Sequence, residues 1–180
     1  MNSSPAASPA RCAPLYKHST MSKSMTEFWD SNYYNHPPLT DDMVSFAESN
    51  LHVKLPTLLV DLLKIQNGGY TKGFVYPMTQ KTTWAENHVP LSELFGIVTN
   101  DSLDSPQNIL LSNYMTQEWG LPEKQVILSG DGHWWITLDY RIDNVPSVKW
   151  IDVECNEEVE IAKNFEDFIN GLVSDDTFEF

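Results

Sequence analysis

The stretch from Gln125 to Tyr140 constrains the fold of this chain more than any other part. Gln125–Leu128 is mostly apolar and β-branched, and His133–Tyr140 is rich in aromatic and β-branched residues. Ser-Gly-Asp-Gly at positions 129–132 lies between them and is typical of a tight turn. A β-hairpin is therefore predicted. We expect Asp131 to bond to the backbone of its own turn.

The region after the hairpin extends the predicted sheet. Ser147–Glu154 reads as a third strand after the loop that contains Pro146, so the three strands form an antiparallel meander. Asn164–Leu172 then has the spacing of a short amphipathic helix that packs back on the sheet. Its apolar stripe is expected at Phe165, Phe168, Ile169 and Leu172.

Two helices are predicted near the start of the domain. The first begins near Leu39, with Thr40 as its cap and acidic residues in its first turn. Its apolar side is expected at Met43, Phe46, Ala47 and Leu51. The second covers Leu55–Ile65 and ends at Asn67-Gly68-Gly69. A tight link between them makes a helical hairpin.

The middle of the chain mixes short strands with one more helix. Tyr70–Tyr76 and the segments around Trp84 and Val89 are β-branched and aromatic, which favours strands. Ile109–Trp119 has a helical pattern. We expect Leu110, Tyr114 and Trp119 on its buried side. The fold class predicted from these elements is α+β: a single domain with a mostly antiparallel sheet packed against helices.

Length and composition divide the 180 residues into one domain with two flanks. Residues 1–24 are rich in Ser, Ala and Pro and are interpreted as a flexible N-terminal arm. Met21 or Met25 could each be the natural start, in which case the arm is an extension and not native. The domain is assigned to residues 25–174, and residues 175–180 to an acidic C-terminal tail.

Charge restricts the classes of partner. Asp and Glu number 25 against 11 Lys and Arg, a formal charge of −14, and the basic residues do not form a patch. Phosphate backbones and anionic membranes would be repelled, so neither nucleic acid nor membrane is an expected partner. A basic protein is favoured. No apolar run approaches the ~20 residues that span a bilayer, and a cytoplasmic location is expected.

Catalysis is not expected. Asp131, His133 and Asp139 include the residue types of acid–base chemistry, yet His133 and Asp139 would stand roughly 20 Å apart along an unbent strand. The five histidines lack metal-ligand spacing, and neither Cys12 nor Cys155 lies next to one of them. We therefore predict no enzyme activity, no metal and no cofactor.

Binding residues are expected on the hairpin and in the acidic last third. Trp134 and Trp135 are adjacent on a strand and point to opposite faces, so one should be buried and the other exposed for contact. Carboxylates near them would attract a basic partner. The predicted partner-binding residues are Trp134, Trp135, Asp131, Glu154, Glu157 and Glu158.

Five segments follow one another along the chain: Leu51–Pro56, Gln66–Tyr70, Ser129–Arg141, Pro146–Glu154 and Phe165–Leu172. Taken in this order, they resemble the SUKH superfamily of Smi/Knr-like domains. The resemblance covers Phe28 to Leu172.

This resemblance implies an α+β fold without known catalytic residues. It also implies a function, because similar bacterial proteins are immunity proteins that bind and block polymorphic toxins, often nucleases. The expected partner is thus a basic, nuclease-type protein toxin, with the protein itself a monomer or weak homodimer. The alternative is a regulatory scaffold of the Smi/Knr type, related to cell-wall synthesis or signalling. The resemblance identifies no contact residues.

Overall fold

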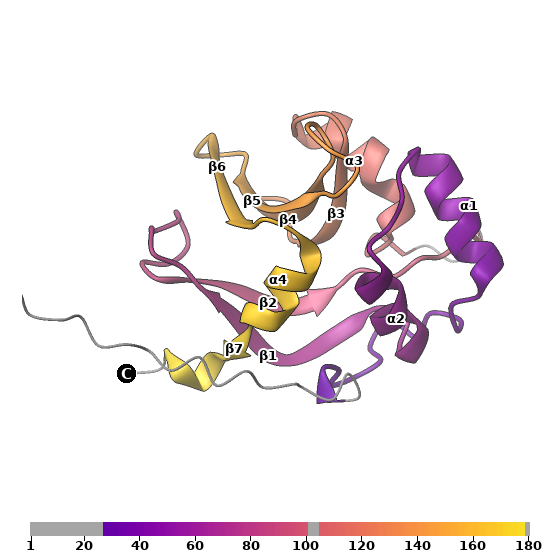
Figure 1. Ribbon diagram of the computed structural model, residues 1–180, viewed down its shortest axis with the longest axis horizontal. Helices are drawn as coiled ribbons and strands as arrows, with labels where there is room; N and C mark the ends of the chain where they lie inside the picture. Colours follow the sequence, from indigo (N-terminus) through magenta and orange to yellow (C-terminus); the bar gives the residue numbers. More distant parts are fainter. Residues whose placement is uncertain (1–26, 101–104, 179–180) are drawn as a thin grey trace, which may run out of the picture.

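Two antiparallel sheets and the helices beside them form the fold in a computed structural model that describes residues 27–100 and 105–178 (Figure 1). The predicted arm, residues 1–24, and the last two residues of the predicted tail lie outside this part. The helices are α1 (Asp41–Leu51), α2 (Thr57–Ile65), α3 (Ser112–Trp119) and α4 (Phe165–Gly171), with 3₁₀ turns η2 (Ile109–Leu111) and η3 (Asp175–Thr177). The strands are β1 (Gly69–Pro77), β2 (His88–Leu94), β3 (Gln125–Gly130), β4 (Trp134–Asp139), β5 (Ser147–Asp152), β6 (Glu157–Ala162) and β7 (Val173–Ser174).

The larger sheet has the order β3-β4-β5-β6 and contains the predicted meander. The smaller sheet has the order β2-β1-β7. The two sheets meet where the amide of Phe95 donates to the carbonyl of Leu128, 2.7 Å away. The predicted α+β class is confirmed, with two small antiparallel sheets where one was expected.

The predicted hairpin is present. Gly130 pairs with Trp135, and the Asp131 carboxylate accepts bonds from the amides of His133 at 3.0 Å and Trp134 at 3.4 Å. Asp131 therefore has the structural role expected of it. Gly130 has φ of +150°, and a Cβ there would lie 2.9 Å from Cδ2 of Trp135. Glycine is thus required for the close approach of the ring.

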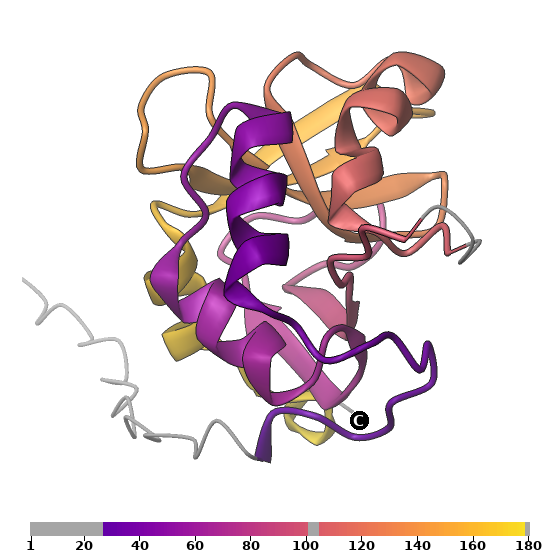
Figure 2. The same cartoon turned by 90° about the vertical axis from the view of Figure 1, so that its right-hand side faces the viewer.

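The helical hairpin is also present, and Figure 2 shows α1 and α2 on one side of the molecule. The Thr40 hydroxyl accepts from the amide of Met43 at 3.3 Å, as the capping pattern predicts. The expected apolar stripe is only partly right. Ala47 and Leu51 are buried, but Phe46 is 53% exposed.

The third helical segment turns a different side inward than predicted. Tyr114 and Trp119 are 62% and 45% exposed, while Ile109, Ser112 and Met115 are buried. The segment begins as a 3₁₀ turn, which has about 3.0 residues per turn, before α3 starts. This changes the phase of the helix, so a stripe drawn over one continuous α-helix selects the wrong residues.

Strand β6 was not predicted. Its sequence, Glu-Glu-Val-Glu-Ile-Ala, alternates charged and apolar residues, and Val159 and Ile161 are buried. Glu157 and Glu158 had been considered only as binding residues. The alternation is the pattern of a half-buried strand.

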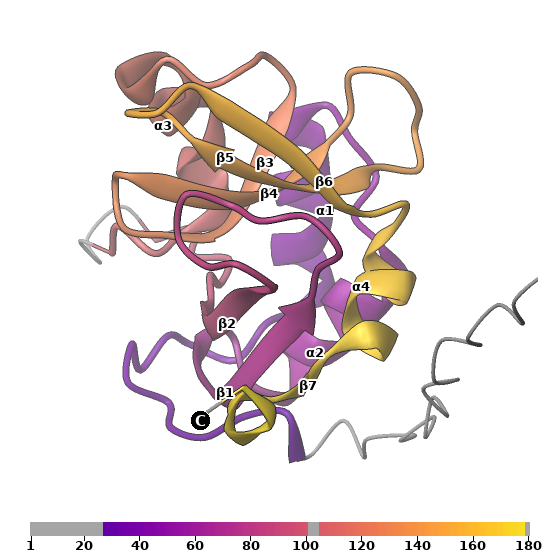
Figure 3. The same ribbon diagram turned by 90° about the vertical axis from the view of Figure 1, so that its left-hand side faces the viewer.

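Helix α4 joins the two sheets, as Figure 3 shows. It contacts β1, β5 and β6, and also α2. Phe165 and Phe168 are both buried, which confirms the predicted stripe at these positions. Among the described residues, no helix has the length and apolar character that crossing a membrane requires.

Candidate protein-binding surface

Two turns lie together at one end of the four-stranded sheet. Trp134 pairs with Asp152, and the amide of Val153 donates to the carbonyl of His133 at 3.2 Å. The β3–β4 turn therefore lies beside the β5–β6 turn. We call this region, residues 131–133 and 153–157, the turn end. It contains the predicted binding residues Asp131, Glu154 and Glu157.

The two turns are linked by an exposed ion pair. Nδ1 of His133 lies 2.8 Å from Oε1 of Glu154, and both side chains are 65% exposed. The hydrogen bond and charge of Glu154 raise the pKa of His133 above its ordinary value, and Asp131 and Asp152 add to this. An exposed pair of this kind orients its groups but contributes little to stability. Glu154 remains accessible to a partner.

Glu157 holds the loop between β1 and β2, which rises toward the larger sheet in Figure 3. The amide of Thr83 donates to Glu157 at 2.8 Å, and its hydroxyl donates to Asp152 at 2.5 Å. This places the neighbouring Trp84 over Trp134, with ring centroids 6.0 Å apart. Glu157 thus positions an exposed aromatic residue as well as adding charge.

The expectation that Trp134 or Trp135 would be exposed is wrong, because both are buried. Trp134 stacks on Trp150 with centroids 4.6 Å apart and is covered by Trp84. Trp135 packs against Trp119, with centroids 6.1 Å apart. Strand alternation shows which face a residue takes but not what covers that face.

The exposed tryptophans are instead those that cover this pair. Trp84 is 59% exposed and Trp119 is 45% exposed. Trp119 also lies against Gly132, where an added Cβ would be 3.2 Å from its ring. Both rings therefore flank the turn end. Sequence reasoning missed them as contact residues, since Trp119 had been assigned to a buried helix face.

Glu158 differs from the other predicted carboxylates because it lies in a charge network. Arg141 contacts both Glu158 and Asp139, and Lys149 lies 3.3 Å from Glu158. Arg141 is the main cause of a lowered pKa at Glu158. Burial would raise the pKa of Asp139, but bonds from Arg141 and Gln125 outweigh it and hold this pKa low. The charge of Glu158 is thus largely compensated within the chain.

The residues considered for catalysis do not form one site. Asp131 bonds to its own turn, His133 pairs with Glu154, and Asp139 pairs with Arg141 at the other end of β4. In residues 27–100 and 105–178, no group of three His, Cys, Asp or Glu side chains is placed to hold a metal ion.

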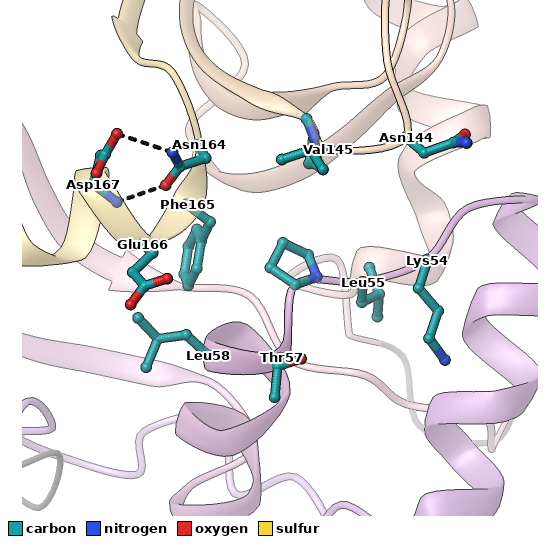
Figure 4. A pocket seen from close by; sticks show the side chains of 12 residues that line it. Lys54, Leu55, Thr57, Leu58, Asn144, Val145, Asn164, Phe165, Glu166 and Asp167 are labelled. Carbon is teal, nitrogen blue, oxygen red and sulfur yellow. Dashed lines mark hydrogen bonds between the residues drawn. The ribbon is translucent and has the colours of Figure 1, made fainter.

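A groove of about 480 Å³ lies elsewhere, between the α1–α2 link, the loop before β5 and the start of α4 (Figure 4). Its lining contains neither histidine nor cysteine. Asn164 and Asp167 bond to one another there as part of the cap of α4. None of the predicted binding residues lines this groove.

Comparison with known proteins identifies the family. The model of the SMI1 / KNR4 family (SUKH-1) matches residues 38–171, which is most of the chain and contains β1–β6 and all four helices named above. No curated protein matches the chain. The matched range includes every predicted binding residue. The chain therefore belongs to the SMI1 / KNR4 (SUKH-1) family.

Proposed function

We propose that this protein is an immunity protein that binds and neutralises a basic, nuclease-type protein toxin. The SUKH-1 family includes toxin immunity proteins. The observation that carries the proposal is the turn end, where exposed carboxylates stand beside two exposed tryptophans. Tryptophan is among the residues most enriched in the energetic centres of protein interfaces.

Charge supports the same kind of partner. With a formal charge of −14, the protein attracts a cationic surface at long range and speeds its association. A nuclease has such a surface where it holds its substrate's phosphates. Covering that surface would block the substrate without any chemistry by the immunity protein. The proposal therefore gives the protein no catalytic role and no cofactor. Its partner is a protein, not a nucleic acid or a membrane, and its proposed location is the cytoplasm.

A regulatory scaffold is the second candidate. The description of the matched family, which names SMI1 and KNR4, favours it. Both candidates require a protein partner. A toxin gene beside the gene for this protein would support immunity, whereas neighbouring wall-synthesis genes would support the scaffold.

The test is neutralisation of the toxin encoded beside this protein. Cells that express the toxin should survive only when this protein is co-expressed, and calorimetry at low salt should detect the complex. The double variant Asp131→Asn/Glu154→Gln should bind the toxin about tenfold or more weakly, since each lost charge contact contributes about 1 kcal/mol. The side-chain amide introduced by Asp131→Asn would keep the acceptor that the turn needs.

The matched control is Asp61→Asn/Glu166→Gln, which removes the same charge from exposed positions on α2 and α4. Its affinity should stay close to that of the unchanged protein. Death of the co-expressing cells together with no complex at low salt would refute the proposal for that toxin.

A further inference from the structure

Three tyrosines gather on the surface where the segment before α1 meets the start of β1. The ring centroids of Tyr33 and Tyr70 are 5.2 Å apart, and each lies 6.1 Å from that of Tyr34. Tyr33 is 70% exposed and Tyr70 is 38% exposed. We call these three residues the tyrosine platform. Exposed tyrosine, like tryptophan, is typical of the energetic centres of interfaces.

Backbone bonds fix the platform in place. The amide of Tyr70 donates to the carbonyl of Ser31 at 3.1 Å, and the amide of Asp30 donates to the carbonyl of Tyr70 at 2.9 Å. The side chain of Gln66 also donates to Ser31. Because the backbone that carries these rings is held before a partner arrives, binding loses less conformational entropy.

Glu93 connects the platform to the turn end. It pairs with Tyr70 across β1 and β2, and its carboxylate accepts a bond from the hydroxyl of Tyr34. The backbone of Gly130, next to Asp131, also bonds to this carboxylate. The platform therefore adjoins the β3–β4 turn and extends the surface already described.

Two carboxyl groups, those of Glu93 and Asp131, lie beside the platform. Burial is the main cause of a raised pKa at Glu93, and the charge of Asp131 adds to it. A carboxylate that has lost water gains from a nearby cation. The open faces of tyrosine rings attract the same cations, and a planar guanidinium can stack on them.

We propose that the tyrosine platform receives an arginine side chain of the basic protein partner, a step that rests on the proposed function. The rings of Tyr33 and Tyr70 are too close for a group to enter between them. The guanidinium stacks on the exposed side of the two rings, where the carboxylates of Glu93 and Asp131 attract its positive charge. Continuity with the turn end lets one partner contact both.

The test uses the peptide acetyl-Gly-Arg-Gly-amide, with citrulline replacing arginine in a control peptide of the same shape without the charge. Titration of the full chain, followed by NMR, should shift resonances of Tyr33, Tyr70 and Glu93 with the arginine peptide only. Tyr33→Ala/Tyr70→Ala should weaken this binding about fivefold. Tyr33→Phe/Tyr70→Phe keeps both rings and should retain it.

Tyr114→Ala is the matched control, since Tyr114 is similarly exposed but lies on α3. It should bind the peptide like the unchanged protein. Equal shifts with both peptides, or unchanged affinity in Tyr33→Ala/Tyr70→Ala, would overturn the inference. Such a result would leave the proposed neutralisation of a toxin unaffected, because that proposal has its own test. Arginine binding at the platform without any toxin complex would refute the proposed function alone.

Discussion

At the scale of single residues, Asn67 shows how much one buried side chain can organise. Its amide group donates to the carbonyls of Pro37 and Ile97, and its carbonyl accepts from the amide of Ile97, each at 2.8 Å. Asn67 is only 4% exposed. It thereby ties the end of α2 to the segment before α1 and to the chain after β2. The sequence pattern had indicated only a helix stop.

Replacing Asn67 with alanine should therefore destabilise the fold. Three backbone groups would lose their partner inside the protein, and we expect the free energy of unfolding to fall by about 2–4 kcal/mol. Urea denaturation measures this change. Asn50→Ala is the control, because Asn50 lies exposed on α1, and it should change stability by less than about 0.5 kcal/mol. A similarly small effect at Asn67 would contradict the prediction.

Glu93 gives a prediction about pH. Its pKa is raised in the folded protein, mainly by burial, so the folded state binds its proton more tightly than the unfolded state does. The stabilisation from this proton is complete below the unfolded pKa and is lost as pH rises through the folded pKa. Glu93→Gln removes this dependence.

Urea unfolding of both proteins at a series of pH values is the measurement. The stability of the unchanged protein relative to Glu93→Gln should decrease as pH rises from the ordinary glutamate pKa toward neutrality. The tyrosine beside it, Tyr34, is neutral over this range, since an ordinary tyrosine pKa is about 10 and burial raises the pKa of Tyr34 further. If the relative stability rose with pH, the pKa of Glu93 would be lowered by folding and not raised.

At the scale of elements, the β3–β4 hairpin depends on one glycine. Gly130→Ala would place a Cβ 2.9 Å from Cδ2 of Trp135 and 2.5 Å from the carbonyl oxygen of Trp134, at positive φ. We expect a loss of about 2–4 kcal/mol in the free energy of unfolding. Gly120→Ala is the control, since Gly120 also has positive φ but nothing within 4 Å of the added Cβ. It should cost about 1 kcal/mol.

The comparison of these two variants separates crowding from backbone strain. Thermal or urea unfolding gives both values. If Gly130→Ala cost no more than Gly120→Ala, Trp135 would have to be free to move, and its burial against Trp119 would not be rigid.

Local patterns predicted elements well where short-range chemistry decides the structure. Thr40, Asp131 and the stripe at Phe165 and Phe168 were each correctly interpreted from neighbours in sequence. Coverage by distant segments was not predictable in this way. Trp134 is buried because the Thr83 contacts bring Trp84 over it from the loop between β1 and β2.

The candidate surface was predicted only in part for the same reason. Asp131 and Glu154 lie at the turn end as expected, but the tyrosine platform joins residues from positions 33 and 70. No spacing in the sequence connects them. Their proximity follows from the backbone bonds that Tyr70 makes with Ser31 and Asp30.

At the scale of the whole molecule, β6 raises the question of self-association. It is the last strand of the larger sheet, and in the described part of the chain no strand pairs with its outer edge. An open edge is a site for pairing with a second copy. Three glutamates occupy this strand, Glu157, Glu158 and Glu160. Arg141 and Lys149 offset the charge of Glu158, so the negative charge of this edge comes mainly from Glu157 and Glu160. Two such edges repel each other, which opposes pairing.

Glu160→Val should therefore promote association. Valine favours strands, and the substitution removes a charge from the edge while the formal charge changes only from −14 to −13. Sedimentation velocity at neutral pH should show a monomer for the unchanged protein and concentration-dependent dimers for Glu160→Val. Glu118→Val makes the same charge change at an exposed position on α3 and should remain monomeric. Equal association of both variants would assign the effect to net charge, and the edge of β6 would then have no special role.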